Sequence, residues 1–420
     1  EVKTPLLALL ESQRAAFKKE GPVGYQTRID RLDRCIGLIV DHQQEICEAV
    51  NKDFGCRSKH VTLMTDLFTS VSTLKFAKKN LKKWMKGEKR SSPIPMNLLG
   101  GKSIIHYQPK GVIGIMTPWN VPVNMIFSPL TDALAAGNRV MIKPSEFTPH
   151  TNQVMQSLFK KYFEETEVAF ACGGPEVGAA FSTLPLDHLI FTGATSIGKL
   201  VMKAAAENLT PVTLELGGKA ANIIMDDAPL DQAIEGVINA IYFNQGHVCC
   251  AGSRLFVQEN VFDEVMWKLK QRMDTLIVGD PLDKNTDVGA INSKAQLKTI
   301  KKYIKAGIDG GADVYQPDCE LPEKGNWCPP TVFTNVAQSS IIAQEEIFGP
   351  VVTIMPFETE EEAVEIANSV NYGLTAYIWT KDSAKGHRMA LNVESGMVWI
   401  NSQNVRHLPT PFGGVKNSGI

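Results

Sequence analysis

Two short apolar runs, Val112-Ile113-Gly114-Ile115-Met116 and Arg139-Val140-Met141-Ile142, decide the fold of this chain. Both have the length of a strand, and an Ala- and Leu-rich segment of helical length at 130–137 lies between them. Strands buried on both faces of a parallel sheet read as continuous apolar runs, and parallel neighbours need a crossover between them. We therefore predict a strand–helix–strand unit at this point.

The same alternation extends in both directions from these runs. It predicts an α/β fold with two parallel sheets and a domain junction near 217–226. Further strands are predicted at 168–171, 188–192, 212–216, 222–225, 253–257, 351–356, 375–380 and 396–400, and helices at 199–208, 261–273, 299–310 and 359–369. Residues 1–85 are predicted to be helical, and two prolines within 86–97 indicate a linker before a strand at 103–107, a possible hairpin arm.

Composition excludes several classes of partner. The 420 residues contain 43 Lys+Arg and 45 Asp+Glu, a net charge of −2, which leaves no electrostatic footprint for nucleic acid or an anionic membrane surface. No apolar run reaches the roughly 18–20 residues that span a bilayer. Hydrophobic residues make up 44% of the chain, so we expect a folded protein that binds neither nucleic acid nor membrane.

The 8 cysteines show no Cys-x-x-Cys pair and no regular spacing, so we expect neither a metal site nor a disulfide framework. Residues 1–20 resemble neither a secretory signal nor a transit peptide. We therefore expect reduced thiols and a cytoplasmic location.

Two motifs could carry chemistry. Cys249 and Cys250 lie between a predicted helix and a strand, where a nucleophilic thiol can meet backbone N–H donors. Alternatively, the two cysteines could be buried apolar residues without a catalytic role. Glu215 lies in an apolar run before Gly217, where burial would raise its pKa toward that of a general base. Glu215 could also face solvent at the end of the strand.

Three further motifs follow predicted strands, where ligands bind to open α/β sheets. They are Pro118-Trp119-Asn120, Lys143-Pro144-Ser145-Glu146 and the turn Gly193-Ala194-Thr195-Ser196-Ile197-Gly198. The Asn amide could donate to an oxyanion, the Lys and Glu could bind ribose hydroxyls, and the Gly-rich turn could hold phosphate. Each could equally be an ordinary turn, a capped surface loop or a tight bend.

As an ordered set, these strings with Glu345-Glu346-Ile347-Phe348-Gly349-Pro350 and Pro411-Phe412-Gly413-Gly414 resemble the aldehyde dehydrogenase superfamily, from about residue 20 to the end. The resemblance implies a Rossmann-like cofactor domain at 1–90 and 110–217, and an oligomerisation hairpin at 91–109. It further implies an α/β catalytic domain at 218–402 and a substrate-funnel loop with a return segment at 403–420. The family usually continues further, so we expect its C-terminal subunit-pairing strand to be mostly absent.

The resemblance also implies the role of each residue. Cys249 would be the nucleophile, Glu215 the general base and Asn120 an oxyanion donor together with the backbone N–H of Cys249. Met125, Arg406 and Phe412 would line the substrate path. The residues implied to bind NAD are Trp119, Lys143, Glu146, Gly174, Gly178, Gly193, Thr195, Gly198, Leu216, Gly217, Glu346 and Phe348.

The implied reaction is oxidation of an aldehyde to a carboxylic acid through a thiohemiacetal and a thioester on Cys249. Glu146 favours NAD, with NADP possible, because a carboxylate beside the ribose repels a 2′-phosphate. Two departures from the family are His247, where Gln is usual, and Ala194, where Ser is usual. The first suggests an altered network around the base or its water, and the second removes a hydroxyl near the diphosphate.

The sequence leaves two substrate classes and one alternative activity open. The first half resembles coniferyl aldehyde dehydrogenases and their long-chain relatives, which suggests an aromatic or a medium- to long-chain aldehyde. In the second half, residues 401–407 resemble muconic semialdehyde dehydrogenases and residues 246–252 the general aliphatic branch, so Arg406 could pair with a substrate carboxylate or could face solvent. Thiol-dependent ester hydrolysis on the same cysteine is a third reading, and a structural protein without activity would not need Cys249, Glu215 and Asn120 together. The hairpin implies a homodimer or homotetramer.

Overall fold

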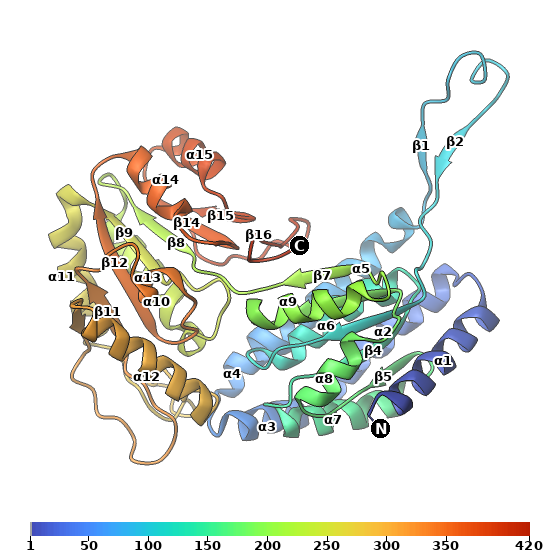
Figure 1. Cartoon of the computed structure of the whole chain (residues 1–420), viewed down its shortest axis with the longest axis horizontal. Helices are drawn as coiled ribbons and strands as arrows, with labels where there is room; N and C mark the ends of the chain where they lie inside the picture. Colours follow the sequence, from blue (N-terminus) through green and yellow to red (C-terminus); the bar gives the residue numbers. More distant parts are fainter. Residues whose placement is uncertain (1) are drawn as a thin grey trace. The chain divides into compact units, whose positions relative to one another are not determined.

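The computed structural model describes residues 2–420, which divide by their contacts into two compact units. The first contains the residues up to Ala49, Thr62–Phe191 and Leu200–Val212. The second contains Val50–Val61, Thr192–Lys199 and Thr213–Ile420. Each unit has a parallel sheet covered by helices (Figure 1).

A five-stranded sheet in the order β5-β4-β3-β6-β7 forms the centre of the first unit. Its strands are β3 (Val112–Met116), β4 (Arg139–Lys143), β5 (Val168–Phe170), β6 (His188–Thr192) and β7 (Val212–Glu215), which leads into the second unit. β3 pairs in parallel with β4 and β6, with Val112 opposite Arg139 and Ile113 opposite His188. All residues of β3 and β4 are buried, as expected for strands covered on both faces.

Helices cover this sheet and set its ligand-binding edge. They are α1 (Lys3–Glu20), α2 (Tyr25–Asp41), the first part of α3 (Gln43–Phe54), the π-helix η1 (Leu63–Phe68), α5 (Thr69–Trp84), α6 (Pro122–Ala135), α7 (Pro149–Tyr162), α8 (Pro175–Ser182) and most of α9 (Thr195–Ala206), with α4 (Lys59–Thr62) at the boundary. α6 packs on β3 and β4 and is covered by α2 and α5. The helices after β3, β4 and β5 each begin at a proline, whose missing N–H is harmless in the first turn.

A buried ion network joins the N-terminal helices to the sheet. Arg31 is 1% exposed and forms ion pairs with Glu20 at 2.8 Å and Glu167 at 3.1 Å. Arg34 also pairs with Glu167, at 2.8 Å, and Arg139 pairs with Glu20 at 2.7 Å. The three guanidinium groups are thus paired with carboxylates, as buried charges require, and Arg34 also pairs with Asp30 at 2.9 Å.

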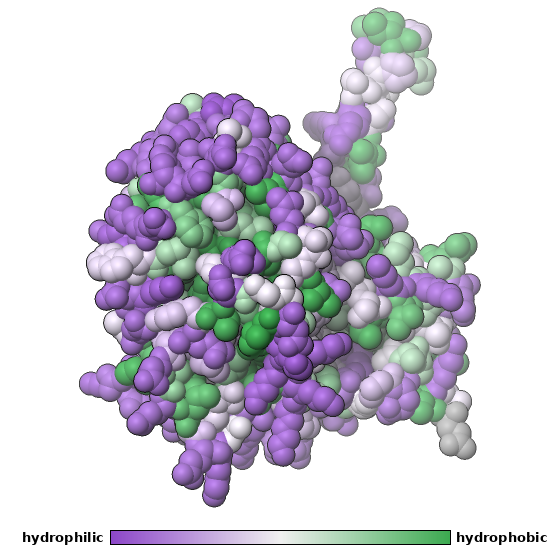
Figure 2. Space-filling model, turned by 60° about the vertical axis from the view of Figure 1, so that its left-hand side comes forward, coloured by the Kyte–Doolittle hydropathy of each residue, from purple (hydrophilic) through white to green (hydrophobic). Residues whose placement is uncertain are grey.

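The predicted hairpin is present in the first unit. β1 (Glu88–Arg90) and β2 (Ser103–Ile105) pair antiparallel, with Glu88 opposite Ile105, and their connection extends away from the helices of this unit (Figure 1). Ile94 and Leu98 in this connection are each 78% exposed, and Figure 2 shows green, hydrophobic atoms at the tip. Clustered exposed apolar side chains are typical of interaction surfaces.

A seven-stranded sheet in the order β10-β11-β12-β9-β8-β14-β15 forms the second unit. Its strands are β8 (Ala221–Ile224), β9 (Arg254–Gln258), β10 (Asp313–Tyr315), β11 (Thr331–Thr334), β12 (Val351–Phe357), β14 (Thr375–Trp379) and β15 (Met397–Ile400). The edge strand β10 is antiparallel to β11, whereas the other pairs are parallel. β13 (Tyr372–Gly373) and β16 (Val415–Lys416) form a separate antiparallel pair.

Helices cover both faces of this second sheet. They are α10 (Leu230–Tyr242), the 3-10 turns η2 (Phe243–Gly246) and η3 (Glu259–Val261), α11 (Phe262–Met273), α12 (Lys294–Asp309), α13 (Ile341–Gln344), α14 (Glu360–Asn368) and α15 (Ser383–Asn392). Successive strand residues point to opposite faces, so Ile224 packs in the core with α10 and α11, and Ile223 packs in the core with α14 and α15. Within residues 2–420, no helix combines the length and the apolar character needed to cross a membrane.

The predicted α/β fold with parallel sheets is confirmed, with differences at element ends. The helix placed at 130–137 begins earlier, at Pro122, because the prolines at 122 and 129 lie inside it and look like breaks in the sequence. β10 and β11 were not predicted, and neither were α7 and α8. The two strands are short, with 3 and 4 residues, so their apolar patterns are weak.

Candidate active site

The cysteine loop of the second unit follows α10 through a left-handed turn. Asn244, Gln245 and Gly246 have φ angles of 51°, 56° and 73°. A Cβ at Gly246 would lie 2.1 Å from the carbonyl oxygen of Gly349, so only glycine fits. The turn thus holds the cysteine loop against the segment that ends at Gly349.

The two cysteines differ in exposure and form a hydrogen bond with each other. Cys249 is partly exposed, whereas Cys250 is 1% exposed, and their Sγ atoms lie 3.7 Å apart. The hydrogen bond to Cys250, together with burial, raises the pKa of Cys249. The same bond, helped by the charge of Arg406, lowers the pKa of Cys250. Exposure therefore favours Cys249 as the nucleophile, and the neighbouring thiol can hold the negative charge.

Arg406 lies beside this cysteine pair. Its Nη2 is 3.5 Å from the Sγ of Cys250, and its guanidinium lies 4.1 Å from the centre of the Phe412 ring. Although the residue is exposed overall, its charged end is thus held at the thiols by a cation–π contact. Among residues 2–420, no Asp or Glu forms an ion pair with Arg406, which leaves its guanidinium available to an anion.

Glu215 ends β7 and is half-buried. Burial, and after it the charge of Cys250, raise its pKa, Arg406 lowers it, and the net result is a pKa of about 7. A Cβ at Gly413 would lie 3.3 Å from Oε1 of Glu215, so the loop after Phe412 passes close to this carboxyl. A carboxyl with a pKa near 7 can accept a proton at neutral pH.

Close contacts explain why Gly217 and Gly218 follow Glu215 and Leu216. A Cβ at Gly217 would lie 2.2 Å from Oε2 of Glu346, and one at Gly218 would lie 2.4 Å from the carbonyl oxygen of Cys249. The backbone N–H of Gly218 donates to Oε1 of Glu346 at 3.1 Å. The two glycines therefore bring the cysteine loop and the Glu346 carboxyl to one stretch of backbone.

Glu346, which the family resemblance implies binds the cofactor, is influenced by the charge of Lys219, whose burial the sequence did not indicate. Burial raises the pKa of Glu346 more than the Gly218 N–H and the charge of Lys219 lower it, and the net result is a pKa of about 7. Lys219 is 2% exposed, and its Nζ has no hydrogen-bond partner. Burial, followed by repulsion from Arg254, lowers the Lys219 pKa to about 7. Buried titratable groups with shifted pKa values mark a candidate functional site. The sequence cannot reveal such a site, because it does not show which groups are buried.

The Gly193–Gly198 turn contacts this segment too. The N–H of Gly193 donates to the carbonyl of Glu215 at 3.0 Å, and the Thr195 hydroxyl donates to the carbonyl of Asn417 at 3.1 Å. A Cβ at Gly198 would meet the Leu216 side chain at 2.5 Å. The turn is therefore packed tightly against the residues that flank Glu215.

In the first unit, Trp119 and Asn120 directly follow β3, and Met125 lies in the first turn of α6. Asn120 is buried, whereas Trp119 and Met125 are half-buried. The carboxylate of Asp66, from the π-helix η1, accepts the N–H groups of Val123 at 2.9 Å and Asn124 at 3.2 Å. This buried cap fixes the start of the helix next to Asn120, and sequence analysis missed it because Asp66 lies far from α6 along the chain.

Lys143 and Glu146 lie at the carboxyl end of β4 and pair at 3.0 Å. Asn152 of α7 holds their loop by donating to the carbonyl of Ser145 at 2.7 Å. A Cβ at Gly178 would lie 3.7 Å from Cε of Lys143, so this glycine of α8 faces the lysine stem. Gly174, the N-cap of α8, follows β5, the strand next to β4.

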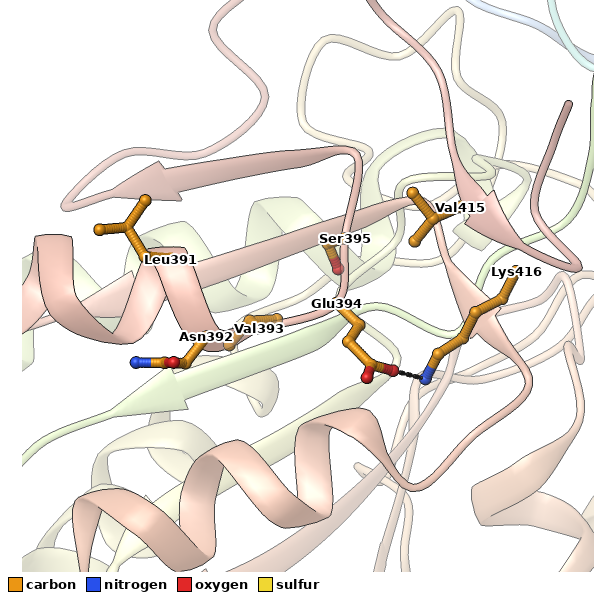
Figure 3. Close-up of a pocket in the computed structure, with 7 residues that line it drawn as sticks. All are labelled: Leu391, Asn392, Val393, Glu394, Ser395, Val415 and Lys416. Atoms are coloured by element: carbon orange, nitrogen blue, oxygen red, sulfur yellow. Dashed lines mark ion pairs between the residues drawn. The ribbon is translucent and has the colours of Figure 1, made fainter.

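A separate hollow lies on the surface of the second unit. It has a volume of about 470 Å³ and lies between the end of α15 and β16 (Figure 3). Its lining includes the ion pair of Lys416 and Glu394 but no cysteine or histidine. Among residues 2–420, no group of three or more His, Cys, Asp and Glu side chains is placed to hold a metal ion.

With this geometry established, comparison with known proteins identifies the class. A family model described as the aldehyde dehydrogenase family matches residues 6–420, so the chain belongs to that family. A probable coniferyl aldehyde dehydrogenase from Caulobacter vibrioides is 41% identical over 98% of this chain and 86% of its own. A 2-hydroxymuconic semialdehyde dehydrogenase from a Pseudomonas species is 36% identical over 98% of this chain and 86% of its own.

Solved structures give the same assignment. The NAD⁺ complex of an aldehyde dehydrogenase from Bacillus cereus has a TM-score of 0.91 and 35% identity, covering 98% of this chain and 84% of that one. The family, shared over nearly the whole chain, makes this protein an oxidoreductase that acts on aldehydes.

Proposed function

We propose that this protein oxidises an aldehyde to a carboxylic acid with NAD, using Cys249 as the nucleophile and Glu215 as the general base. The observation that carries the proposal is the pairing, in one unit, of a partly exposed Cys249 with a half-buried Glu215 whose pKa is about 7. Because the Cys250 hydrogen bond and burial raise the pKa of Cys249, its thiol must lose a proton before it attacks, and Glu215, with a pKa of about 7, can accept that proton. The covalent intermediate that the thiolate then forms divides a difficult reaction into two easier steps.

Each step follows from the residues. The Cys249 thiolate adds to the aldehyde carbon, and its backbone N–H, with the Asn120 amide, donates to the resulting oxyanion. Bound NAD would supply the hydride acceptor, and loss of hydride from this carbon would leave a thioester on Cys249. Glu215 takes a proton from water, the hydroxide attacks the thioester carbonyl, and the carboxylic acid departs as the Cys249 thiolate is restored.

The first unit has suitable residues to hold a dinucleotide. Lys143 and Glu146 follow β4, where parallel sheets bind ligands, and Gly178 faces the Lys143 stem, which a Cβ at this position would touch at 3.7 Å. Trp119 and Gly174 follow the neighbouring strands. In the second unit, Gly193, Thr195, Gly198, Leu216, Gly217, Glu346 and Phe348 are the remaining candidates. Because Glu146 would repel a 2′-phosphate, we propose NAD as the preferred cofactor, with NADP possible.

The test is NADH formation, followed by absorbance, with cinnamyl-type, long aliphatic and carboxylated aldehydes and with either cofactor. Cys249→Ala should abolish turnover, a loss on the order of 10⁴-fold or more, whereas Cys250→Ala should retain most of it. Equal losses in the two variants would contradict the assignment of Cys249. Glu146→Gln should improve use of NADP relative to NAD by about tenfold, the value of one charged contact.

For the substrate we propose an aromatic, coniferyl-type or a medium- to long-chain aldehyde, supported by the 41% identity to a probable coniferyl aldehyde dehydrogenase. A second candidate is a semialdehyde that bears a carboxylate. It is favoured by the Arg406 guanidinium beside Cys250 and by the 36% identity to a semialdehyde dehydrogenase.

Arg406→Leu distinguishes the two candidates. If Arg406 binds a carboxylate, the variant should lose about 10- to 100-fold in kcat/KM on carboxylated semialdehydes and little on cinnamyl aldehydes. Hydrolysis of an aryl ester without NAD, at a rate above that of aldehyde oxidation, would instead favour the thiol esterase.

We also propose that the hairpin pairs copies of this chain into a homodimer or homotetramer. Its exposed apolar tip supports this proposal. The double variant Leu98→Glu, Leu99→Glu should lower the mass measured by sedimentation, while Leu391→Glu, at another exposed leucine, should not.

A further inference from the structure

His247 lies two positions before Cys249, at a position where the family usually has Gln, and its side chain contacts Phe348 and Asn292. The residue is fully buried, with 0% exposure. Its Nδ1 is 2.9 Å from the carbonyl oxygen of Phe348, and its Nε2 is 3.4 Å from the backbone nitrogen of Asn292. The altered network expected at this position therefore forms around Phe348.

The partners define the state of the imidazole. A carbonyl can only accept, so Nδ1 carries the proton, and a backbone N–H can only donate, so Nε2 offers its lone pair. Burial lowers the pKa of His247 to about 3, with Arg57 acting in the same direction and the Phe348 bond opposing. The neutral ring thus joins two segments and does not exchange protons at neutral pH.

The ring of His247 also stacks on the ring of Phe348. Their centroids are 5.6 Å apart and the planes are inclined by 26°. Phe348 has a φ angle of 55°, an uncommon conformation for a residue with a bulky side chain, so contacts must stabilise it. Gln296 of α12 supplies one such contact, since its Nε2 donates to the same carbonyl at 3.1 Å. His247 supplies a second hydrogen bond to this carbonyl, from the cysteine loop.

We propose that His247 is a positioning residue that fixes Phe348 for contact with the nicotinamide and couples this contact to the Cys249 loop. The left-handed turn at Gly246 strengthens the coupling, because it lies against Gly349, the residue after Phe348. The inference rests on the proposed function, in which Phe348 contacts the cofactor. Its chemistry is that of a neutral ring holding an aromatic side chain in a strained conformation.

Three substitutions separate the two contacts of the ring. His247→Leu removes the hydrogen bonds and the stacking, His247→Phe keeps an aromatic ring, and His247→Gln keeps an amide that can donate to the Phe348 carbonyl. His387→Leu is the control, because it makes the same chemical change at an exposed position on α15. For each variant, the Kd of NAD is measured by calorimetry, and KM and kcat are measured over a range of pH.

We expect His247→Leu to raise the Kd and KM of NAD about tenfold, with the KM of the aldehyde and the midpoint of the pH profile unchanged. His247→Gln should recover most of the loss, and His247→Phe should recover less. Hydrogen exchange without cofactor should be faster at residues 347–349 in His247→Leu than in His387→Leu. If His247→Leu does not fold, the order of the Gln and Phe variants still decides the question.

Unchanged Kd and exchange in a folded His247→Leu would overturn the inference, and so would a shifted pH midpoint, which would indicate proton transfer by His247. Phe348→Ala distinguishes this result from a failure of the proposed function. If wild type binds NAD and Phe348→Ala weakens binding, the function stands and only the His247 inference falls. If wild type neither binds NAD nor oxidises aldehydes, the proposed function falls and the inference with it.

Discussion

The two units hold their candidate site residues in different ways. In the first unit, Lys143 and Glu146 pair across three positions, and the residues that follow β3 and β4 lie just before helices that start at proline. In the second, the contacts join distant segments: Glu346 with Gly218 across 128 positions, His247 with Phe348 across 101, and Arg406 with Cys250 across 156. The second site therefore depends on close packing of several loops, whereas the first depends on strand ends and helix starts.

This difference suggests what each unit tolerates. Changes in the second unit should alter the chemistry directly, because its titratable groups are buried together and influence each other's pKa. Changes in the first unit should instead lower the free energy of unfolding by moderate amounts, because they weaken ion pairs and the starts of helices. The following four experiments test this contrast.

The largest effect is expected for Glu215→Gln, which should lower kcat by about 10²- to 10⁴-fold. A carboxyl acts as a base only after it loses its proton, so with a pKa of about 7 the wild-type rate should rise as pH increases through 7. The variant should lack this rise. Glu365→Gln, on the exposed face of α14, is the control, and a retained rise in Glu215→Gln would assign the base to another group.

Gly217→Ala tests the close packing of the second unit. The new Cβ would lie 2.2 Å from Oε2 of Glu346 and must displace this carboxyl. We expect the KM of NAD to rise about 10- to 100-fold, the effect of losing one or two hydrogen bonds. Gly279→Ala, whose Cβ would make only an ordinary contact at 3.7 Å, should behave as wild type. Equal values for the two variants would mean that the Gly217 segment yields easily.

In the first unit, Glu167→Gln should reduce stability by about 2–3 kcal/mol at pH 7. Burial alone would raise the pKa of Glu167, but hydrogen bonds and charge from Arg34 and Arg31 lower it to about 2. A lowered folded pKa stabilises the protein above the unfolded value near 4.5, and this stability is lost as pH falls from there toward 2.

Denaturant unfolding between pH 7 and 2 measures this contribution. The wild-type curve should fall steeply with acid, and the Glu167→Gln curve should be flatter. Glu165→Gln, two residues away and exposed, should change stability by less than about 0.5 kcal/mol. A flat wild-type curve over this range would show that the network does not stabilise the fold.

A smaller loss, about 1–2 kcal/mol, is expected for Asp66→Ala, which removes the carboxylate that caps α6. The amides of Val123 and Asn124 should exchange faster with solvent, while exchange in the second unit stays the same. Asp66→Asn keeps an oxygen acceptor and should recover part of the stability. Full stability in Asp66→Ala would mean that Pro122 alone is enough to start this helix.

Much of this molecule follows from local sequence patterns. The apolar runs at Val112–Met116 and His188–Thr192 match strands of the structure with the same bounds. Strand and helix periodicities extend over a few residues, so a sequence can display them without any knowledge of the fold. The motif residues around Cys249 and Glu215 are likewise visible, because their spacing along the chain is characteristic of the family.

Contacts between distant segments could not be predicted in this way. The sequence shows that His247 departs from the family, and it does not show whether the Arg406 side chain faces the substrate or solvent. Only the folded chain places the first against Phe348 and the second against Cys250. Asp66 gave no signal, and the Glu-Leu-Gly-Gly-Lys string that ends at Lys219 gave no hint that this lysine is buried, since both roles depend on partners in other elements.

The sequence by itself thus determined the class of fold, the order of strands and helices, and the family. The tertiary structure alone decided which thiol is exposed, which carboxyls have a pKa near 7, and which side chains hold Phe348 and α6 in place. The physical reason is that hydrophobic periodicity is a local property, whereas desolvation and electrostatic coupling depend on every group that packing brings near.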